Sequence, residues 1–171
     1  GVDTIVGTME KHYAVSSLLD AGGKILGQLC SQEDIAKAID ALKSNTTSEA
    51  EKRYAAAIVS NLAFDDEMLN AIVEGGGIKT LLALIESGDA PSNIADICVR
   101  AIGRLGTSAE GLEQLLSSNA IKSILAIVEN DDVSAESLAS ALLTFKTLST
   151  CDEGVEAIVN CGGLDSLLRS I

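Results

Sequence analysis

Apolar residues recur along the chain in stripes that repeat every 43 residues. Segments 78–85, 121–128 and 164–171 align without a gap and keep their apolar positions, and a weaker copy lies at 35–42. Within each segment the apolar residues stand one, three or four positions apart, a spacing that places them on one face of a helix. A fixed period of this length is typical of stacked helical units that bury their faces against each other.

Each unit is expected to hold three helices, described here for residues 66–108. A short helix is predicted over 67–74, a second over 78–86 and a longer third over 92–105. Between the first two stands a glycine cluster whose middle position reads Gly76, Asn119 and Gly162 in successive units. Glycine and asparagine tolerate the left-handed backbone that ends a helix. A phosphate-binding loop is the alternative, but no Gly-Lys-Ser/Thr follows the cluster.

The unit boundaries divide what we expect to be one domain, 1–171, into five parts. A partial unit at 1–22 is expected to hold only a third helix, from about Thr4 to Leu19. Three full units follow at 23–65, 66–108 and 109–151, and a partial unit occupies 152–171. Repeat stacks normally carry polar terminal units. We therefore expect either a longer native polypeptide or an association of the uncapped ends with another molecule, self-association included.

Three stretches resemble the armadillo repeat. Residues 55–63 read AAAIVSNLA, residues 71–78 read AIVEGGGI and residues 81–85 read LLALI. The family pattern is close to AAWALSNLA, AIVEAGAI and LVxLL, in the same order and at the same spacing. The resemblance covers the whole chain and is strongest from Tyr54 to Glu86. It implies an all-α fold, a right-handed superhelical α-solenoid of armadillo repeats with three helices per 43-residue repeat.

The resemblance also implies a mode of binding. In armadillo repeats the third helices line a concave groove that takes an extended peptide or a partner helix. Members that bind nuclear-import peptides carry Trp and Asn four residues apart on these helices. Here only Asn61 matches, whereas Ala57 takes the Trp position and Arg100 and Arg104 replace the pair in the next unit. We expect a non-catalytic scaffold that does not bind import signals in that way. The alternative is a structural spacer in a larger repeat protein, with binding done by flanking regions.

Helical spacing along the third helices gives the positions expected to face the groove. They are Arg53, Ala57, Asn61, Asp96, Arg100, Arg104, Leu143 and Thr147. Because arginine can hold a carboxylate or a phosphate through two hydrogen bonds, one hypothesis is a locally basic groove for an acidic or phosphorylated segment. The alternative is that the arginines pair with nearby acids such as Asp96 and Glu49. The amide of Asn61 would bond either a peptide backbone or a local carbonyl group.

The charge balance narrows the class of partner. The chain holds 25 acidic and 12 basic residues, a net charge of -13. Such a surface repels a phosphate backbone, so nucleic acid is not expected as a partner. The acidity would attract basic partners, or it serves solubility alone. No apolar run approaches the ~20 residues that span a bilayer, so no direct insertion into a membrane is expected.

No pattern in the sequence predicts catalysis, a cofactor or a metal site. The four cysteines form no CxxC pair and take small or apolar positions of the repeat. We expect them to be reduced, which fits a cytoplasmic or nuclear location. His12, the single histidine, has no catalytic pattern beside it and takes a position that is apolar and expected to be buried in the other units, so we do not expect a catalytic role for it. The protein is therefore not expected to be an enzyme.

Overall fold

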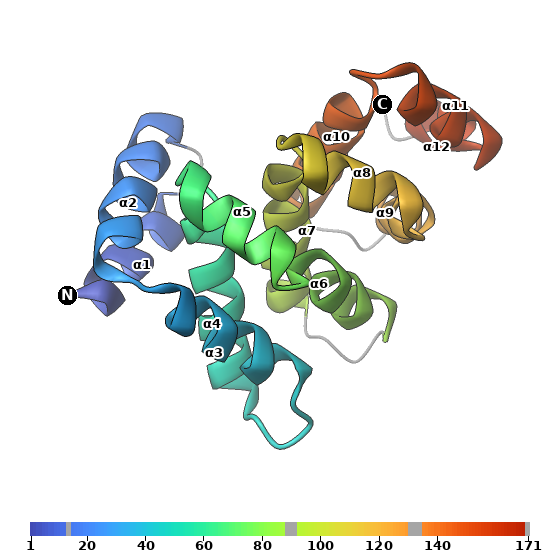
Figure 1. The fold of residues 1–171 in the computed structure, drawn as a ribbon. Coiled ribbons are helices and arrows are strands. Elements are labelled where there is room, and N and C mark those ends of the chain that lie inside the picture. The colour runs from blue at the N-terminus through green and yellow to red at the C-terminus, as the bar shows by residue number, and fades with distance from the viewer. Residues whose placement is uncertain (13–14, 88–91, 130–134, 170–171) are drawn as a thin grey trace.

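The computed structural model describes residues 1–12, 15–87, 92–129 and 135–169. All regular secondary structure in these ranges is helical, so the fold is all-α (Figure 1). The helices are α1 (Val2–Lys11), α2 (Ser16–Leu29), α3 (Gln32–Lys43), α4 (Glu49–Leu62), α5 (Asp66–Glu74), α6 (Gly77–Glu86), α7 (Ser92–Leu105), α8 (Ala109–Ser117), α9 (Ala120–Val128), α10 (Ala135–Leu148), α11 (Asp152–Asn160) and α12 (Gly163–Arg169).

From α5 to α10 the helices follow a short, short, long order. The predicted helices over 67–74, 78–86 and 92–105 are confirmed as α5, α6 and α7, with ends that differ by at most one residue. The same three lengths return within one residue in α8, α9 and α10. The 43-residue pattern of the sequence is therefore also a pattern of helices.

Equivalent helices of successive units pack on one another. Among the long helices, α4 contacts α7 and α7 contacts α10; among the short ones, α5 contacts α8 and α6 contacts α9. These contacts form rows that cross the molecule, and the first and last helices lie on opposite sides of it (Figure 1).

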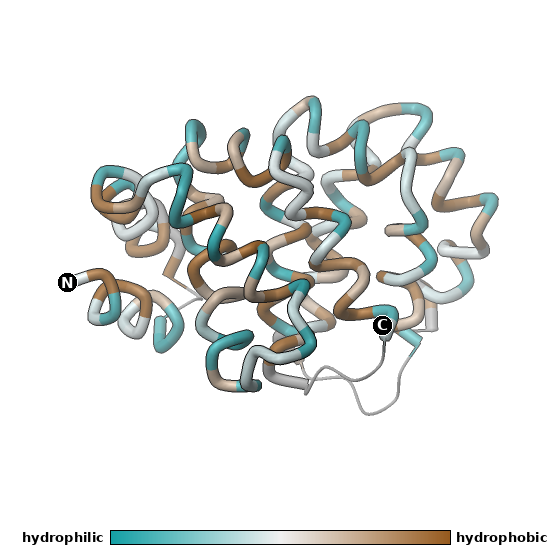
Figure 2. Tube along the Cα trace, turned by 60° about the horizontal axis from the view of Figure 1, so that its bottom comes forward, coloured by the Kyte–Doolittle hydropathy of each residue, from teal (hydrophilic) through white to brown (hydrophobic). Residues whose placement is uncertain are grey.

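The core lies between these rows. Apolar and polar positions alternate along the helices in Figure 2, so each helix has one side suited to burial. Leu62, Leu105 and Leu148 occupy one repeat position at the end of the long helices, and all three are fully buried. Burying such a side chain completely contributes about 1.5–3 kcal/mol, so the repeated stripe is a main source of stability.

Glycine sets the sharp break between the two short helices in two of the three units. Gly76 has φ 80° and Gly162 has φ 76°, which confirms the predicted left-handed backbone. At Asn119 the prediction is wrong, because φ is -81° there. In that unit Ser118 makes the break in an extended conformation, and its hydroxyl accepts a hydrogen bond from the Ala120 amide at 3.2 Å. A serine thus replaces the left-handed residue.

The N-terminal helices depart from the repeat. The single helix expected from Thr4 to Leu19 is instead two helices, α1 and α2, and the boundary expected after residue 22 falls inside α2. A Cβ atom on Gly22 would lie 2.5 Å from Sδ of Met9, and one on Gly23 would lie 2.4 Å from Cβ of Phe64. These glycines therefore do not end a helix. They let α2 lie directly against α1 and against the end of α4.

The last helix exposes apolar side chains. Leu164 and Leu168 of α12 are exposed, whereas the equivalent residues of α9, Ile121 and Leu125, are buried. The difference arises because α12 packs on α9, so that α9 is covered on a side where α12 is not.

Candidate functional site

A groove with a volume of about 820 Å³ lies between α1, α4 and α7. Four of the residues expected to face a groove line it together: Arg53, Ala57, Asp96 and Arg100. The rest of the lining comes from Asp3, Val6, Gly7, Glu10, Lys11, Ala50, Tyr54 and Ile97. Asp3, Lys11 and Tyr54 were not among the positions expected to face the groove, and Asp3 precedes the helix that was expected from Thr4 to Leu19.

Local hydrogen bonds fix the start of α4, the helix between the other two. The Ser48 hydroxyl accepts from the Glu51 amide at 3.4 Å, and the Glu51 carboxylate accepts from the Ser48 amide at 2.9 Å. Hydrogen bonds from the Ser48 hydroxyl and amide lower the pKa of Glu51. This capping box sets where the helix begins, so Arg53 and Ala57 fall on the same face, one turn apart.

Arg100 is the centre of a partly buried polar cluster. Its Nη2 donates to Oε1 of Glu10 at 2.6 Å, and its Nε donates to the Ser60 hydroxyl at 3.3 Å. The side chain of Arg100 is only 18% exposed and that of Glu10 only 22%. An ion pair of this arginine, one of the two alternatives considered, therefore exists with Glu10 of α1, 90 residues away.

Asn61 belongs to the same cluster. It was expected to face a ligand, but it is 1% exposed, because α1 lies over it. Its Nδ2 donates to the same Oε1 of Glu10 at 3.3 Å, so its partner is a carboxylate and neither a local carbonyl nor a peptide backbone.

Arg104 does not line the groove. Its Nε donates to the carbonyl oxygen of Ala63 at 3.1 Å, and its guanidinium carbon lies 4.7 Å from the centre of the Phe64 ring. A cation over an aromatic face is attracted to it. Arg104 thus ties α7 to the end of α4, which is a structural role.

The two sites predicted on α10 lie apart from the groove lining. Leu143 is 56% exposed, and Thr147 donates its hydroxyl to the carbonyl oxygen of Leu143 at 3.1 Å. A hydroxyl bonded back to its own helix offers less to a partner.

The carboxylates of the groove are all engaged. Asp3 accepts the Tyr54 hydroxyl, Asp96 accepts the Ser137 hydroxyl, and Glu10 is held as described above. The hydrogen bond to Asp3 is the main reason why the pKa of Tyr54 is raised to about 12. Tyr54 therefore stays protonated at neutral pH and keeps this bond.

Two cations of the groove are not engaged. Arg53 and Lys11 are exposed, and neither makes an ion pair or a hydrogen bond with any residue that the structure describes. Hydrogen bonds from neutral hydroxyls leave the charges of Asp3 and Asp96 in place, so the groove lining holds three acids and three cations. Arg53 and Lys11 are the cations of this lining that have no described partner.

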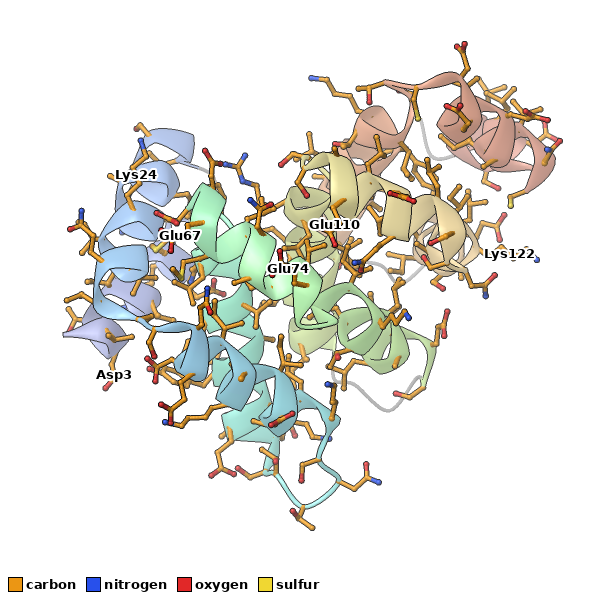
Figure 3. All side chains as sticks on the ribbon, viewed as in Figure 1. Asp3, Lys24, Glu67, Glu74, Glu110 and Lys122 are labelled. Atoms are coloured by element: carbon orange, nitrogen blue, oxygen red, sulfur yellow. The ribbon has the colours of Figure 1, made fainter. Side chains whose placement is uncertain are left out.

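The excess of negative charge lies elsewhere, on the row of first helices. Figure 3 shows Glu67 and Glu74 on α5 and Glu110 on α8, on the side of the molecule that faces the viewer. The helices α5, α8 and α11 contain no lysine or arginine, and their acidic residues are all exposed. These acidic residues are Asp66, Glu67, Glu74, Glu110, Glu113, Asp152, Glu153 and Glu156.

The remaining reactive groups do not gather into a site. His12 is exposed, whereas the equivalent residues of the other units are buried; it caps the C-terminal end of α1. All four cysteines are free thiols, and burial raises the pKa of Cys98 to about 12. Within the described residues no group of three or more His, Cys, Asp or Glu is placed to hold a metal ion.

No described helix is by itself long and apolar enough to cross a membrane. Taken together, α5 and α6 have the length and apolar composition of a membrane-spanning segment, but the pair is bent by 67°.

Comparisons with known proteins bear on the fold alone. No family model matches the chain, and no curated protein matches it. Among solved structures it is similar to an engineered protein whose crystal structure came from the Northeast Structural Genomics Consortium. That similarity covers 98% of this chain and 70% of the other, with a TM-score of 0.67 and 20% identity. At that identity the likeness shows only a shared arrangement of helices.

Proposed function

We propose that the protein is a non-catalytic interaction module of the armadillo type, a right-handed α-solenoid that binds an acidic peptide segment or partner helix. Two observations support the architecture. The helices recur in a short, short, long order, and each packs on its equivalent in the next unit. Such stacking leaves an extended surface on one side, which repeat proteins use for binding. The free thiols fit a reducing compartment, so we propose a cytoplasmic or nuclear location.

The charge arrangement of the groove carries the proposal for the partner. Arg53 and Lys11 are exposed and without a described partner, while each groove carboxylate is already bonded to a residue of the chain. An approaching carboxylate therefore finds two cations and displaces no existing contact of theirs, although the charges of Asp3 and Asp96 in the same lining act against it. A hollowed surface strengthens such an attraction relative to a flat one.

A phosphorylated segment would use the same two cations. A phosphate carries roughly two negative charges and can accept two parallel hydrogen bonds from a guanidinium. The unpaired guanidinium of Arg53 is the group suited to it.

The test uses four synthetic peptides with the same apolar residues. One carries several glutamates, one carries glutamine in their place, one carries lysine in their place, and one carries phosphoserine. Binding is measured by fluorescence anisotropy. We expect the glutamate peptide to bind more tightly than the glutamine peptide, although the net charge of -13 acts against it.

The matched variants are Arg53→Gln and Lys79→Gln. Both remove one positive charge from an exposed side chain, but Lys79 lies on α6 and does not line the groove. We expect Arg53→Gln to weaken binding of the glutamate peptide by up to about fivefold, the range of an exposed ion pair, and Lys79→Gln to change it little. A preference for the lysine peptide would assign binding to the acidic first helices. Failure of all four peptides to bind would favour the structural spacer.

The exposed leucines of α12 support a second contact. Leu164 and Leu168 present apolar surface where the equivalent residues of α9 are covered. We propose that this face associates with another helical unit, either a further part of the polypeptide or a second copy. Sedimentation of the chain and of its Leu168→Glu variant tests the second option, which predicts a lower oligomer content in the variant.

A further inference from the structure

We propose that Arg100 and Asn61 form a carboxylate-binding site, and that Glu10 of α1 occupies it as an internal substitute for a carboxylate of the partner. The proposal deepens the function proposed above and rests on it, because it names the partner as an amphipathic helix that takes the place of α1.

The site has the chemistry of a carboxylate receptor. Oε1 of Glu10 accepts from Nη2 of Arg100 at 2.6 Å and from Nδ2 of Asn61 at 3.3 Å. Nε of Arg100 donates to Ser60 at 3.3 Å, which holds the guanidinium in place. A charge-assisted bond in a partly desolvated position is stronger than one at an open surface. These groups would hold any carboxylate brought to the same point.

The combination of Asn and Arg at these two repeat positions occurs once in the sequence. In the next unit the residues equivalent to Asn61 and Arg100 are Arg104 and Leu143, which cannot form it. The cover is also particular to α4: Ala57 is 4% exposed under α1, whereas its equivalent on α10, Leu143, is 56% exposed. Thus α1 lies on the long-helix row at the place where a partner helix would lie.

The face that α1 turns to α4 and α7 has the spacing of a docked amphipathic helix. Asp3, Val6 and Glu10 stand at positions i, i+3 and i+7, the spacing by which helical ligands fill grooves. Asp3 accepts a hydrogen bond from the Tyr54 hydroxyl, Val6 is buried, and Glu10 accepts a hydrogen bond from Arg100. The partner defined by these contacts has an aliphatic residue between two acids that are seven positions apart.

The helix α1 is suited to leave this position. Gly7 and several β-branched residues lower its intrinsic helix propensity, and no side chain caps its start. Its buried side chains are Val6 and Met9, whereas α4 buries seven residues. Short terminal elements with few buried contacts open most readily.

Displacement would proceed by exchange of one carboxylate for another at Arg100. The incoming acid takes the bonds from Arg100 and Asn61, and Glu10 passes into water with α1. Lys11 leaves with α1, so Arg53 and Arg100 are the groove cations that a partner would keep. Removing the charge of Lys11 should therefore weaken binding only if the partner binds beside an α1 that stays in place.

The first test is amide hydrogen exchange of the Glu10→Gln variant. Glutamine keeps the shape of the side chain but loses the charge. We expect exchange in α1 to rise by about tenfold or more, with α4 and α7 unchanged, since a hydrogen bond to a charged group is lost. The matched control is Glu33→Gln, which breaks an exposed pair with Lys37 and is expected to leave α1 unchanged. Unchanged exchange in α1 would mean that Glu10 does not hold this helix, and faster exchange throughout α4 and α7 would assign Glu10 to the stability of the whole fold. Either result overturns the proposal.

The second test adds a fluorescent synthetic peptide with the sequence of residues 1–12. We expect it to bind the Glu10→Gln chain about tenfold more tightly than the wild-type chain, because the internal competitor is weakened. The same peptide with glutamine in place of its glutamate should lose this advantage. Equal binding to both chains overturns the carboxylate site. Lys11→Gln in the chain should not weaken binding, and a loss equal to that of Arg53→Gln would contradict displacement of α1.

These outcomes are separate from those of the proposed function. If acidic peptides bind through Arg53 but Glu10→Gln changes neither α1 nor their affinity, the groove function stands and the inference fails. If α1 opens in the variant and takes the peptide in exchange, but no other acidic peptide binds, the inference stands and the wider function fails.

Discussion

The long helices α4 and α10 carry the same repeat positions, yet they present them differently. On α4 the positions of Ala57 and Asn61 are covered, whereas on α10 the equivalent Leu143 is open and Thr147 is half-buried. The helices have equal length, and each packs on α7. The difference comes from α1, which lies over α4. Repeat position therefore determines the direction of a side chain, and the neighbouring element determines whether a ligand can reach it.

Truncation of leucines on α10 is the strongest test of that comparison. Leu148 is fully buried and Leu143 is 56% exposed on the same helix. We expect Leu148→Ala to lower the free energy of unfolding by about 2–5 kcal/mol through a cavity in the core. Leu143→Ala should change it by less than about 0.5 kcal/mol. Urea denaturation measures both, and a large loss from Leu143→Ala would mean that this face is covered in solution.

Glycine substitutions test the close packing of the N-terminal region. A Cβ atom on Gly23 would lie 2.4 Å from Cβ of Phe64 and 2.9 Å from the carbonyl oxygen of Asn61, so Gly23→Ala pushes α2 away from α4. We expect a loss of about 1–3 kcal/mol. Gly7 in α1 has open space around it, so Gly7→Ala should stabilise by up to about 1 kcal/mol through helix propensity. Thermal unfolding distinguishes the two, and a gain for both would contradict the packing of α2.

The smallest expected effect concerns the hydrogen bond between Tyr54 and Asp3. In the folded protein the pKa of Tyr54 is raised from 10.0 to about 12. The bond therefore contributes fully below pH 10, and its contribution is lost as the pH rises from about 10 to about 12. Because Tyr54 is 40% exposed, solvent screening limits this contribution to less than about 1 kcal/mol.

The measurement is the urea midpoint of the wild-type chain and of Tyr54→Phe at pH 9 and at pH 11. The wild type should lose more stability between the two values than the variant. Equal losses would mean that the hydroxyl does not hold α1, and the account of the covered face would then rest on Glu10 alone.

Prediction from the sequence succeeded where the units are regular. The ends of α5, α6 and α7 follow from apolar spacing and from the glycine break, since both are local features that recur. It failed in the first unit because the boundary after residue 22 was carried over from the 43-residue period, whereas α2 runs through Gly22 and Gly23. A glycine can end a helix, or it can sit inside one and allow another helix to approach, and only the neighbours Met9 and Phe64 show which applies.

The candidate site shows the same division. Helical spacing brought Arg53, Ala57, Asp96 and Arg100 to one groove. It did not anticipate that Glu10 would reach Arg100 across 90 residues, that Asn61 would be covered, or that Arg104 would lie on Phe64. Each of these depends on how one helix is placed and oriented relative to another, which no local pattern encodes.

The sequence by itself determined the repeat and the helical faces. Each of these follows from residue type and spacing along a single helix. Only the tertiary structure decided which charged side chains form ion pairs and which have no described partner. Glu10 and Arg100 neutralise each other while Arg53 and Lys11 stay exposed, because pairing depends on distance in space, and α1 packs on α4 so that Glu10 lies against Arg100.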